Sequence, residues 1–212
     1  MINLSEIFLS VQGESTYQGL PCIFIRFTGC NLRCSYCDTV YSYEEGTKTS
    51  IEQIIKTIEQ YRPVNLVEIT GGEPLLQESI YPLFEALHSY GNNILIETNG
   101  SQNLQNVPNY VVKIVDVKCP GSGEEQSFLI ENLLHINPQD ELKFVLSDYT
   151  DYQFAKNFIA KHTINTTKIH FSPVYGRLKP DQLAEWIVRD RLNVRLHIQL
   201  HKIVWSPDKR GV

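Results

Sequence analysis

Short apolar runs bounded by turn residues recur along the chain and predict strands. Runs rich in Val, Ile, Leu and Phe, several of them ending at Gly or Asn, cover residues 20–28, 64–70, 93–98, 111–117, 141–147, 168–172 and 195–200. An extended segment over residues 6–11 precedes them. This length and composition are typical of β-strands.

Amphipathic stretches between these runs predict helices. The clearest covers residues 50–60, where four isoleucines recur at helical spacing and Ser50 with Gln53 forms a capping-box pattern. Further helices are expected over residues 79–90, 128–135, 150–161 and 180–189. We expect no helix between the third and fourth of the apolar runs.

Strands that alternate with helices imply right-handed crossovers and a mainly parallel sheet. The chain contains no internal repeat and no long linker, so residues 1–212 are expected to form a single domain. About six strand–helix units are too few for a closed eight-stranded barrel. The predicted fold is therefore α/β, a partial, open (β/α)6-type barrel with a reduced number of helices.

Residues that carry chemistry follow the predicted strands. Three cysteines follow the first run, Gly71-Gly72-Glu73-Pro74 follows the second, and Glu97 with Asn99 ends the third. The fourth is followed by Asp116 and Lys118, and the sixth ends at Ser172-Pro173. Active sites of parallel barrels lie at the carboxyl ends of the strands, so these residues are expected on one rim.

Composition and charge exclude several functional classes. The chain has 212 residues, is 42% hydrophobic and carries a formal net charge of −5, so a general nucleic-acid-binding role is not expected. No apolar run has the length of a membrane span, and the first ten residues lack the basic region of a signal peptide. We expect an intracellular, cytoplasmic protein.

The five cysteines indicate a metal site. Their number is odd, and Cys30, Cys34 and Cys37 form a C-x3-C-x2-C pattern within eight residues. Thiolates suit zinc or iron–sulfur clusters. A [4Fe–4S] cluster held by three thiolates keeps one iron open for a small molecule, which favours the cluster. Structural zinc is the alternative; it needs a fourth ligand, and Cys119 is the available thiol.

Two motifs resemble those of a known superfamily. Cys30 to Cys37, with Tyr36 before the last cysteine, resembles the cluster motif of radical S-adenosylmethionine (SAM) enzymes, and Gly71-Gly72-Glu73-Pro74 resembles their second signature. Four further segments narrow the resemblance to the 7-carboxy-7-deazaguanine synthase family, and it extends over the whole chain. They are Val11-Gln12-Gly13-Glu14-Ser15, Asp38-Thr39, Gln199-Leu200-His201-Lys202 and the terminal Lys209-Arg210-Gly211-Val212.

The resemblance implies a reaction and its cofactors. The family converts 6-carboxy-5,6,7,8-tetrahydropterin to 7-carboxy-7-deazaguanine, a precursor of queuosine, with loss of ammonia. It uses a [4Fe–4S] cluster, SAM and Mg²⁺, and a 5′-deoxyadenosyl radical takes a hydrogen atom from the pterin. A homodimer and an external electron donor such as a flavodoxin are implied as partners. Whether the product enters tRNA modification or another 7-deazapurine pathway stays open.

The same resemblance implies roles for individual residues. Cys30, Cys34 and Cys37 would hold the cluster, and Thr39 would bind Mg²⁺. The residues that would border SAM are Tyr36, Cys37, Asp38, Gly72, Glu73, Asp116, Val117, Lys118, Phe171, Ser172, Pro173 and Val174. Those that would contact the pterin are Val11, Gln12, Gly13, Glu14, Arg26, Thr70, His201 and Val212.

Two other functions are weighed against this one. A radical SAM activase, which makes a glycyl radical on a partner protein, shares the cysteines; turnover of a small pterin without a protein partner would distinguish it. A zinc-stabilised binding module would be colourless and hold one zinc. Arg26 points either into the barrel or outward, and the roles of Cys119 and His201 are open.

Overall fold

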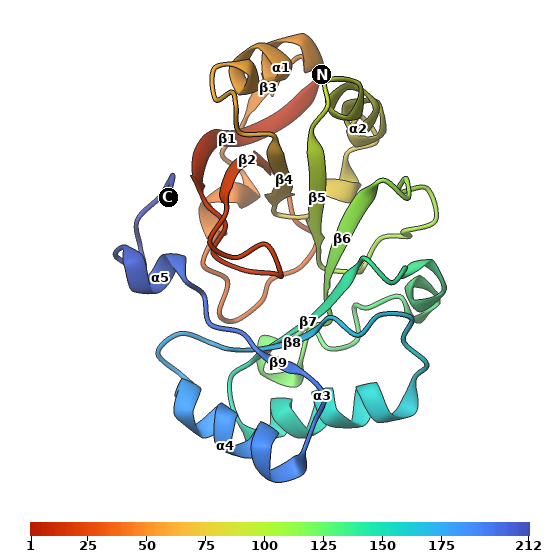
Figure 1. The fold of residues 1–212 in the computed structure, drawn as a ribbon, viewed down its shortest axis with the longest axis vertical. Helices are drawn as coiled ribbons and strands as arrows, with labels where there is room; N and C mark the ends of the chain where they lie inside the picture. Colours follow the sequence, from red (N-terminus) through yellow and green to blue (C-terminus); the bar gives the residue numbers. More distant parts are fainter.

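A nine-stranded sheet curls around the centre of the molecule in a computed structural model that describes all residues 1–212 (Figure 1). The sheet order is β3-β1-β2-β4-β5-β6-β7-β8-β9. β1 is antiparallel to both its neighbours, and all pairs from β2 onward are parallel. The strands are β1 (Ile2–Val11), β2 (Pro21–Phe27), β3 (Thr47–Thr49), β4 (Leu66–Gly71), β5 (Asn93–Thr98), β6 (Val111–Asp116), β7 (Glu141–Leu146), β8 (Ile169–Pro173) and β9 (Arg195–Leu196).

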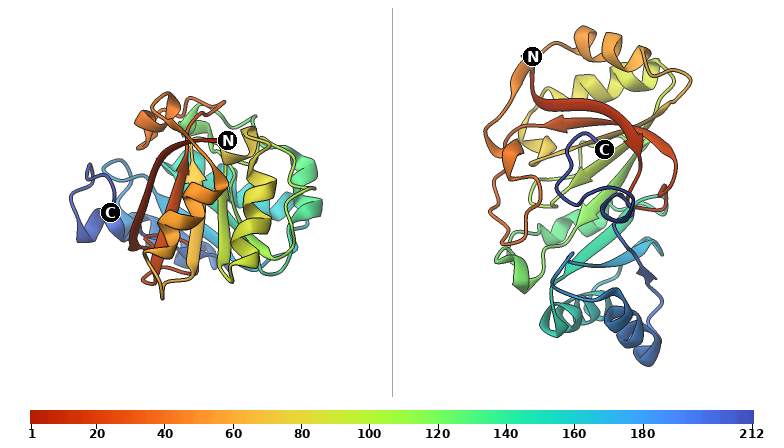
Figure 2. Two further views of the ribbon diagram at one scale, coloured as in Figure 1. Left: turned by 90° about the horizontal axis from the view of Figure 1, so that it is seen from above. Right: turned by 90° about the vertical axis from the view of Figure 1, so that its left-hand side faces the viewer.

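The four longer helices lie against the outer face of the sheet (Figure 2). The α-helices are α1 (Ile51–Glu59), α2 (Ile80–Ser89), α3 (Tyr149–Lys161), α4 (Pro180–Asp190) and α5 (His201–Val204). Four short 3₁₀-helices complete the structure: η1 (Val40–Tyr43), η2 (Pro74–Leu76), η3 (Pro120–Ser122) and η4 (Ile130–His135). No helix has the length and apolar character needed to cross a bilayer.

The two faces of the sheet have different side chains because successive residues of a strand point in opposite directions. On β4, Val67 and Ile69 belong to the main hydrophobic core that packs under the helices. Glu68 and Thr70 alternate with them and line the interior of the barrel. The outer layer therefore stabilises the fold, and the inner layer is available for chemistry.

The barrel is open between its edge strands, and two irregular segments meet across this side. The loop that follows β1 and the segment that follows β9 are joined by backbone bonding: the amide of Leu200 donates to Gly13 at 2.9 Å. The side chain of Gln18 donates to the carbonyl of Ile198 at 2.7 Å. The C-terminal segment, with α5, then lies beside β1 and β2 (Figure 1). It thus becomes part of the barrel wall.

The architecture predicted from the sequence, a partial open barrel, is confirmed. All eight predicted extended segments contain strands, the helix over residues 50–60 has both bonds of its capping box, and no helix joins β5 to β6. The short strand β3 and the one-turn helix α5 were not predicted.

Two predicted elements are corrected. Residues 128–135 form a 3₁₀-helix over Ile130–His135 instead of an α-helix. Its Asn132 side chain bonds to the backbone of Gly100, Gln102 and Leu104, which fastens the segment to the β5–β6 connection. The strand predicted over residues 195–200 covers only Arg195–Leu196, because the chain then turns toward the loop after β1.

Candidate active site

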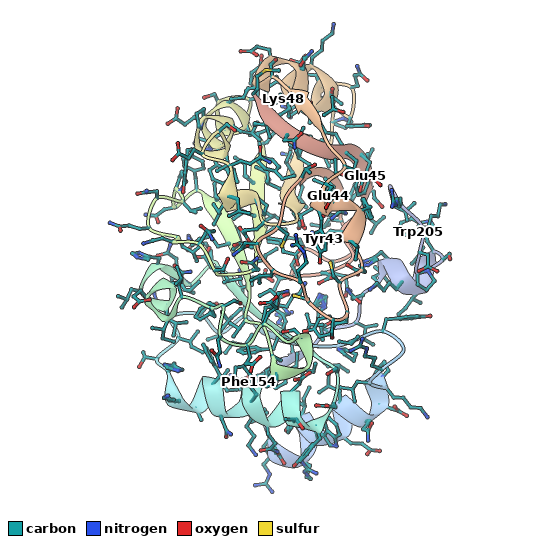
Figure 3. The ribbon with its side chains drawn as sticks, turned by 180° about the vertical axis from the view of Figure 1, so that it is seen from behind. Tyr43, Glu44, Glu45, Lys48, Phe154 and Trp205 are labelled. Carbon is teal, nitrogen blue, oxygen red and sulfur yellow. The ribbon has the colours of Figure 1, made fainter.

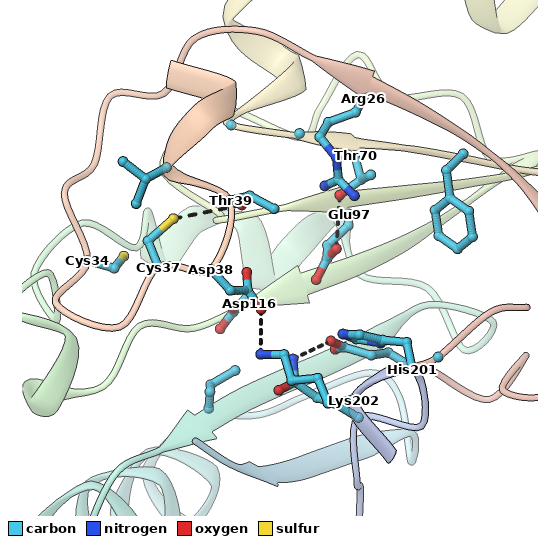
Figure 4. A pocket seen from close by; sticks show the side chains of 18 of the residues that line it. Arg26, Cys34, Cys37, Asp38, Thr39, Thr70, Glu97, Asp116, His201 and Lys202 are labelled. Carbon is cyan, nitrogen blue, oxygen red and sulfur yellow. Dashed lines mark hydrogen bonds and ion pairs between the residues drawn. The ribbon is translucent and has the colours of Figure 1, made fainter. Parts of the chain in front are cut away.

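The interior of the barrel contains a cavity of about 760 Å³ (Figure 4). It extends from the cysteine loop past Thr70 to Glu68. The cysteine loop, residues 28–39, lies at the carboxyl end of β2. It touches the loop after β4: the amide of Glu73 donates to the carbonyl of Gly29 at 2.7 Å. A Cβ at Gly72 would lie 2.1 Å from that same carbonyl oxygen, so only glycine permits this approach.

The thiols of Cys30, Cys34 and Cys37 all line this end of the cavity, are partly exposed and form no disulfide. The amide of Leu32 donates to Cys30 Sγ at 3.4 Å. Cys119 is completely buried outside the cavity, with its thiol donating to the carbonyl of Val117 at 3.8 Å. No group of three or more His, Cys, Asp or Glu side chains is close enough to hold a single metal ion.

The donor set fits a cluster held by three thiolates. Three soft ligands from one loop face a shared space, and the fourth thiol that a closed zinc site would need is packed in the core. A backbone amide directed at a cysteine sulfur is one of the contacts by which proteins tune iron–sulfur clusters.

Contacts from three later segments hold the middle of the cysteine loop. The amide of Ser35 donates to Ser122 at 3.0 Å, and its hydroxyl donates to Gly121 at 2.7 Å. The phenol of Tyr36 donates to the carbonyl of Val145 at 3.1 Å. Arg177 donates to the carbonyl of Ser35 at 3.0 Å. The spacing of the three cysteines is thus supported by the distant half of the chain.

The next part of the cavity wall has free hydrogen-bonding capacity. Asp116 is bound to Lys118 at 2.7 Å through Oδ2, while its Oδ1 is buried with no partner. Burial lowers the pKa of Lys118, but Asp116 and Cys34 outweigh it, so the pKa lies above the usual value. This free acceptor, Asp116 Oδ1, fits a ligand with hydroxyl or amine groups, as SAM has.

Seven of the twelve residues expected to border SAM line the cavity: Tyr36, Cys37, Asp38, Gly72, Asp116, Lys118 and Val174. Glu73, Val117, Phe171, Ser172 and Pro173 do not line it. The Phe171 ring packs against Phe144 and Tyr152 in the outer core. Its position on β8 places that side chain on the helix side of the sheet.

The Glu73 side chain is engaged by groups of the protein itself. Its carboxylate is buried and accepts from the amide of Leu75, the hydroxyl of Thr98 and the amide of Asn99, at 2.7 to 3.1 Å. Burial raises its pKa to about 7. Glu73 therefore joins the rims of β4 and β5, and it has no free face toward the cavity.

All eight residues expected to contact the pterin line the cavity: Val11, Gln12, Gly13, Glu14, Arg26, Thr70, His201 and Val212. Arg26 points into the barrel, where it pairs with Glu6 at 2.7 Å, and Tyr41 donates to the same carboxylate at 2.8 Å. Arg26, Thr70 and Glu97 gather on one wall in Figure 4. Segments from both ends of the chain thus meet here.

Two charged residues of this region, Glu68 and Lys143, were not assigned to the site from the sequence, and Glu97 was expected on the rim without a specific role. Lys143 is 5% exposed and bridges Glu14 at 2.5 Å and Glu97 at 2.6 Å. Gln12 donates to Glu68, and Thr70 donates to Glu97 at 3.0 Å. One feature of the sequence could have identified these residues: each is a charged residue inside an apolar run that predicts a strand. A charge buried in a strand requires a partner, so such residues are expected to pair with one another.

Comparisons with known proteins agree with this geometry. The model of the radical SAM superfamily matches residues 24–117. The 7-carboxy-7-deazaguanine synthase of Koribacter versatilis is 47% identical over the full length of both chains. That of Chlorobaculum tepidum is 44% identical, covering 100% of this chain and 97% of the relative. This chain belongs to the 7-carboxy-7-deazaguanine synthase family.

Solved structures support the family assignment. The crystal structure of QueE from Escherichia coli superimposes with a TM-score of 0.79 and 26% identity, covering 94% of both chains. Streptococcus suis SuiB shares the fold alone, with a TM-score of 0.56 and 14% identity over 80% of this chain and 48% of that one. In this member of the 7-carboxy-7-deazaguanine synthase family, the motifs therefore sit on the expected architecture.

In this family member, Asp38 contacts the C-terminal segment, and Thr39 lies beside the last cysteine of the cysteine loop. Lys202 binds Asp38 at 2.6 Å, so the C-terminal segment reaches the cysteine loop (Figure 4). Burial would raise the pKa of Asp38, but Lys202 holds it below the usual value. Thr39 Oγ1 lies 3.7 Å from Cys37 Sγ and faces the cavity. A hydroxyl there can serve a hard cation beside the cluster end.

Proposed function

We propose that this chain converts 6-carboxy-5,6,7,8-tetrahydropterin to 7-carboxy-7-deazaguanine with loss of ammonia. The observation that carries the proposal is one cavity with two chemically distinct ends. Three thiols lie at one end, and Gln12, Glu14, Arg26 and Thr70 surround the other. The named relatives, two of which match over almost their whole length, support the same reaction.

Cys30, Cys34 and Cys37 would hold the cluster, which together with SAM would supply the radical chemistry for removal of a hydrogen atom from C6 of the pterin. The residues of this chain bind and orient the substrate. Arg26 and Lys143 are cations that stay paired with glutamates, so the wall they form is polar without a large net charge.

We further propose that Thr39 takes part in an Mg²⁺ site. Mg²⁺ prefers oxygen ligands and keeps several waters, so one protein hydroxyl and the substrate carboxylate form a reasonable partial set. The ion would neutralise that carboxylate and hold C6 toward the cluster end. The position of Thr39 on the cavity wall beside Cys37 supports this proposal.

A cytoplasmic location, a homodimer and a flavodoxin-type electron donor complete the proposal. The five free cysteines suit a reducing compartment. The dimer and the donor rest on the family resemblance. Light scattering would test the dimer, and reduction of the cluster by purified flavodoxin would test the donor.

The deciding experiment is an anaerobic assay of the reconstituted protein with reductant, SAM, Mg²⁺ and 6-carboxytetrahydropterin. Mass spectrometry should detect 7-carboxy-7-deazaguanine together with 5′-deoxyadenosine. The assay contains no protein partner, so turnover would also exclude a glycyl radical activase. A colourless protein with one bound zinc and no product would refute the proposal.

A further inference from the structure

We propose that Glu68 is the residue that recognises the 2-amino end of the pterin and so determines substrate specificity. The inference rests on the proposed function. It concerns a side chain that none of the sequence motifs includes. Glu68 lies on the inner face of β4, is 4% exposed and lines the cavity.

The orientation of the substrate follows from its chemistry. The reacting carbon, C6, carries the carboxylate, and the 2-amino group lies at the opposite end of the fused rings. C6 must face the cysteine end, where the radical is generated. The pyrimidine ring with its 2-amino group must therefore point toward the other end of the cavity.

Glu68 occupies that other end. It precedes Thr70 by two residues on a strand whose carboxyl end faces the cysteine loop, so it lies about 6–7 Å deeper in the barrel. Its neighbours in register are Phe24 on β2 and Leu95 on β5. Both belong to a small apolar cluster. A carboxyl group in an otherwise apolar layer is costly unless it has hydrogen-bonding partners.

Hydrogen bonding distinguishes Glu68 from the two other glutamates of the cavity. Glu14 is bound by Lys143 and by Gln199 at 2.7 Å, and Glu97 is bound by Lys143 and Thr70. Glu68 accepts one hydrogen bond, from Gln12 to Oε2, and its Oε1 has no partner. An acceptor is therefore left for an amine at this depth, where the substrate brings its 2-amino group.

The electrostatics of Glu68 reflect its depth in the barrel. Burial, followed by the nearby Glu97 and Glu14, raises the pKa of Glu68 well above its usual value.

Two stable probes that differ at one position test the inference. 6-Carboxypterin has the 2-amino group, and 6-carboxylumazine has a carbonyl oxygen there. Their dissociation constants are measured anaerobically by fluorescence on the cluster-containing protein with SAM and without reductant. Wild-type protein should bind carboxypterin at least about tenfold more tightly, because two facing acceptors cannot form a hydrogen bond.

Substitutions then assign the preference to Glu68. Glu68→Leu and Glu68→Ser should each reduce the ratio of the two dissociation constants by at least about fivefold. Glu68→Gln should also reduce the preference, because Gln12 donates to its single acceptor oxygen and the NH2 group is left facing the substrate. Glu141→Gln is the matched control: Glu141 is buried outside the cavity, where it accepts from Thr16, so its loss should change both affinities equally.

The outcomes separate the inference from the function. No preference in wild-type protein, or a wild-type ratio in both Glu68→Leu and Glu68→Ser, would overturn the role of Glu68. If one of these two variants does not fold, the other decides. Failure of wild-type protein to form product from 6-carboxytetrahydropterin would instead refute the proposed function, whatever the binding ratios are.

Discussion

Lys143 is the cation that pairs with both Glu14 and Glu97 at the pterin end of the cavity. Burial would raise the pKa of Glu14, but Lys143 and His201 hold it well below the usual value. A depressed carboxyl pKa contributes stability that is present above the unfolded pKa of about 4.3 and is lost as pH falls toward the folded value. In wild-type protein this contribution is therefore complete at pH 5 and at pH 7.

Replacing Lys143 with Met should change that dependence. Glu14 and Glu97 would lose their cation, at a cost of about 3–5 kcal/mol near neutral pH. The pKa of Glu14 would then be raised, so the difference in stability between wild type and variant should become smaller as pH falls from 7 to 5. Thermal unfolding at the two pH values measures this difference, and Lys143→Arg is the control that keeps the charge. A constant gap between variant and wild type would contradict the assigned pairing.

Thr39 provides a second test at the scale of one side chain. Thr39→Ala should raise the Mg²⁺ concentration for half-maximal activity by at least about tenfold, because the protein hydroxyl is lost. The iron content and the absorbance of the cluster should not change. Thr39→Ser keeps the hydroxyl and should keep the response. An unaltered Mg²⁺ dependence in Thr39→Ala would remove Thr39 from the metal site.

At the scale of elements, the loop after β1 and helix α5 form a single unit of the wall. Their backbones are bonded through Leu200 and Gly13, and a Cβ at residue 13 would lie 2.2 Å from Nδ1 of His201. Gln199, just before this helix, also donates to Glu14. The contact explains why a Gln-Gly-Glu segment and a Gln-Leu-His segment, far apart in sequence, occur together.

Gly13→Ala should therefore displace His201 and α5. We expect KM for the pterin to rise by about tenfold or more while the cluster and SAM binding are retained, since a clash of this size forces a local shift. The double variant Gly13→Ala/His201→Ala relieves the clash. It should be no worse than His201→Ala alone, which steady-state kinetics of the three variants can show. Additive effects would contradict a direct contact.

Some helices and strands could be predicted from the sequence, and others could not. The strands and α1 were predictable because hydrophobic period and capping are local properties. The 3₁₀ form of η4 was not, because Asn132 bonds to residues near position 100. The cysteine loop was recognisable from its spacing. The placement of the Glu73 and Phe171 side chains outside the cavity depends on which face of the strand or loop each occupies, and the motifs did not specify it.

At the scale of the molecule, the cavity is completed by the last residues of the chain. Residues 207–212 line it, and the guanidinium of Arg210 lies 3.7 Å from the centroid of the Tyr41 ring and 3.4 Å from Glu45. Tyr41 is bonded to Glu6, which pairs with Arg26. Figure 3 shows Glu45 and Trp205 on the facing segments of this region. The tail thus covers the substrate end and contributes little to the core.

Removal of residues 207–212 should consequently separate substrate binding from folding. These residues are mostly exposed, so the melting temperature should change by no more than about 2 °C, and the cluster should form normally. KM for the pterin should rise at least about tenfold, because Val212 and Arg210 no longer close the cavity. SAM cleavage without pterin should continue at the wild-type rate, since the cysteine loop is held by Gly121, Ser122 and Arg177. An unchanged KM in the truncated protein would show that the tail lies against the cavity without contacting the substrate.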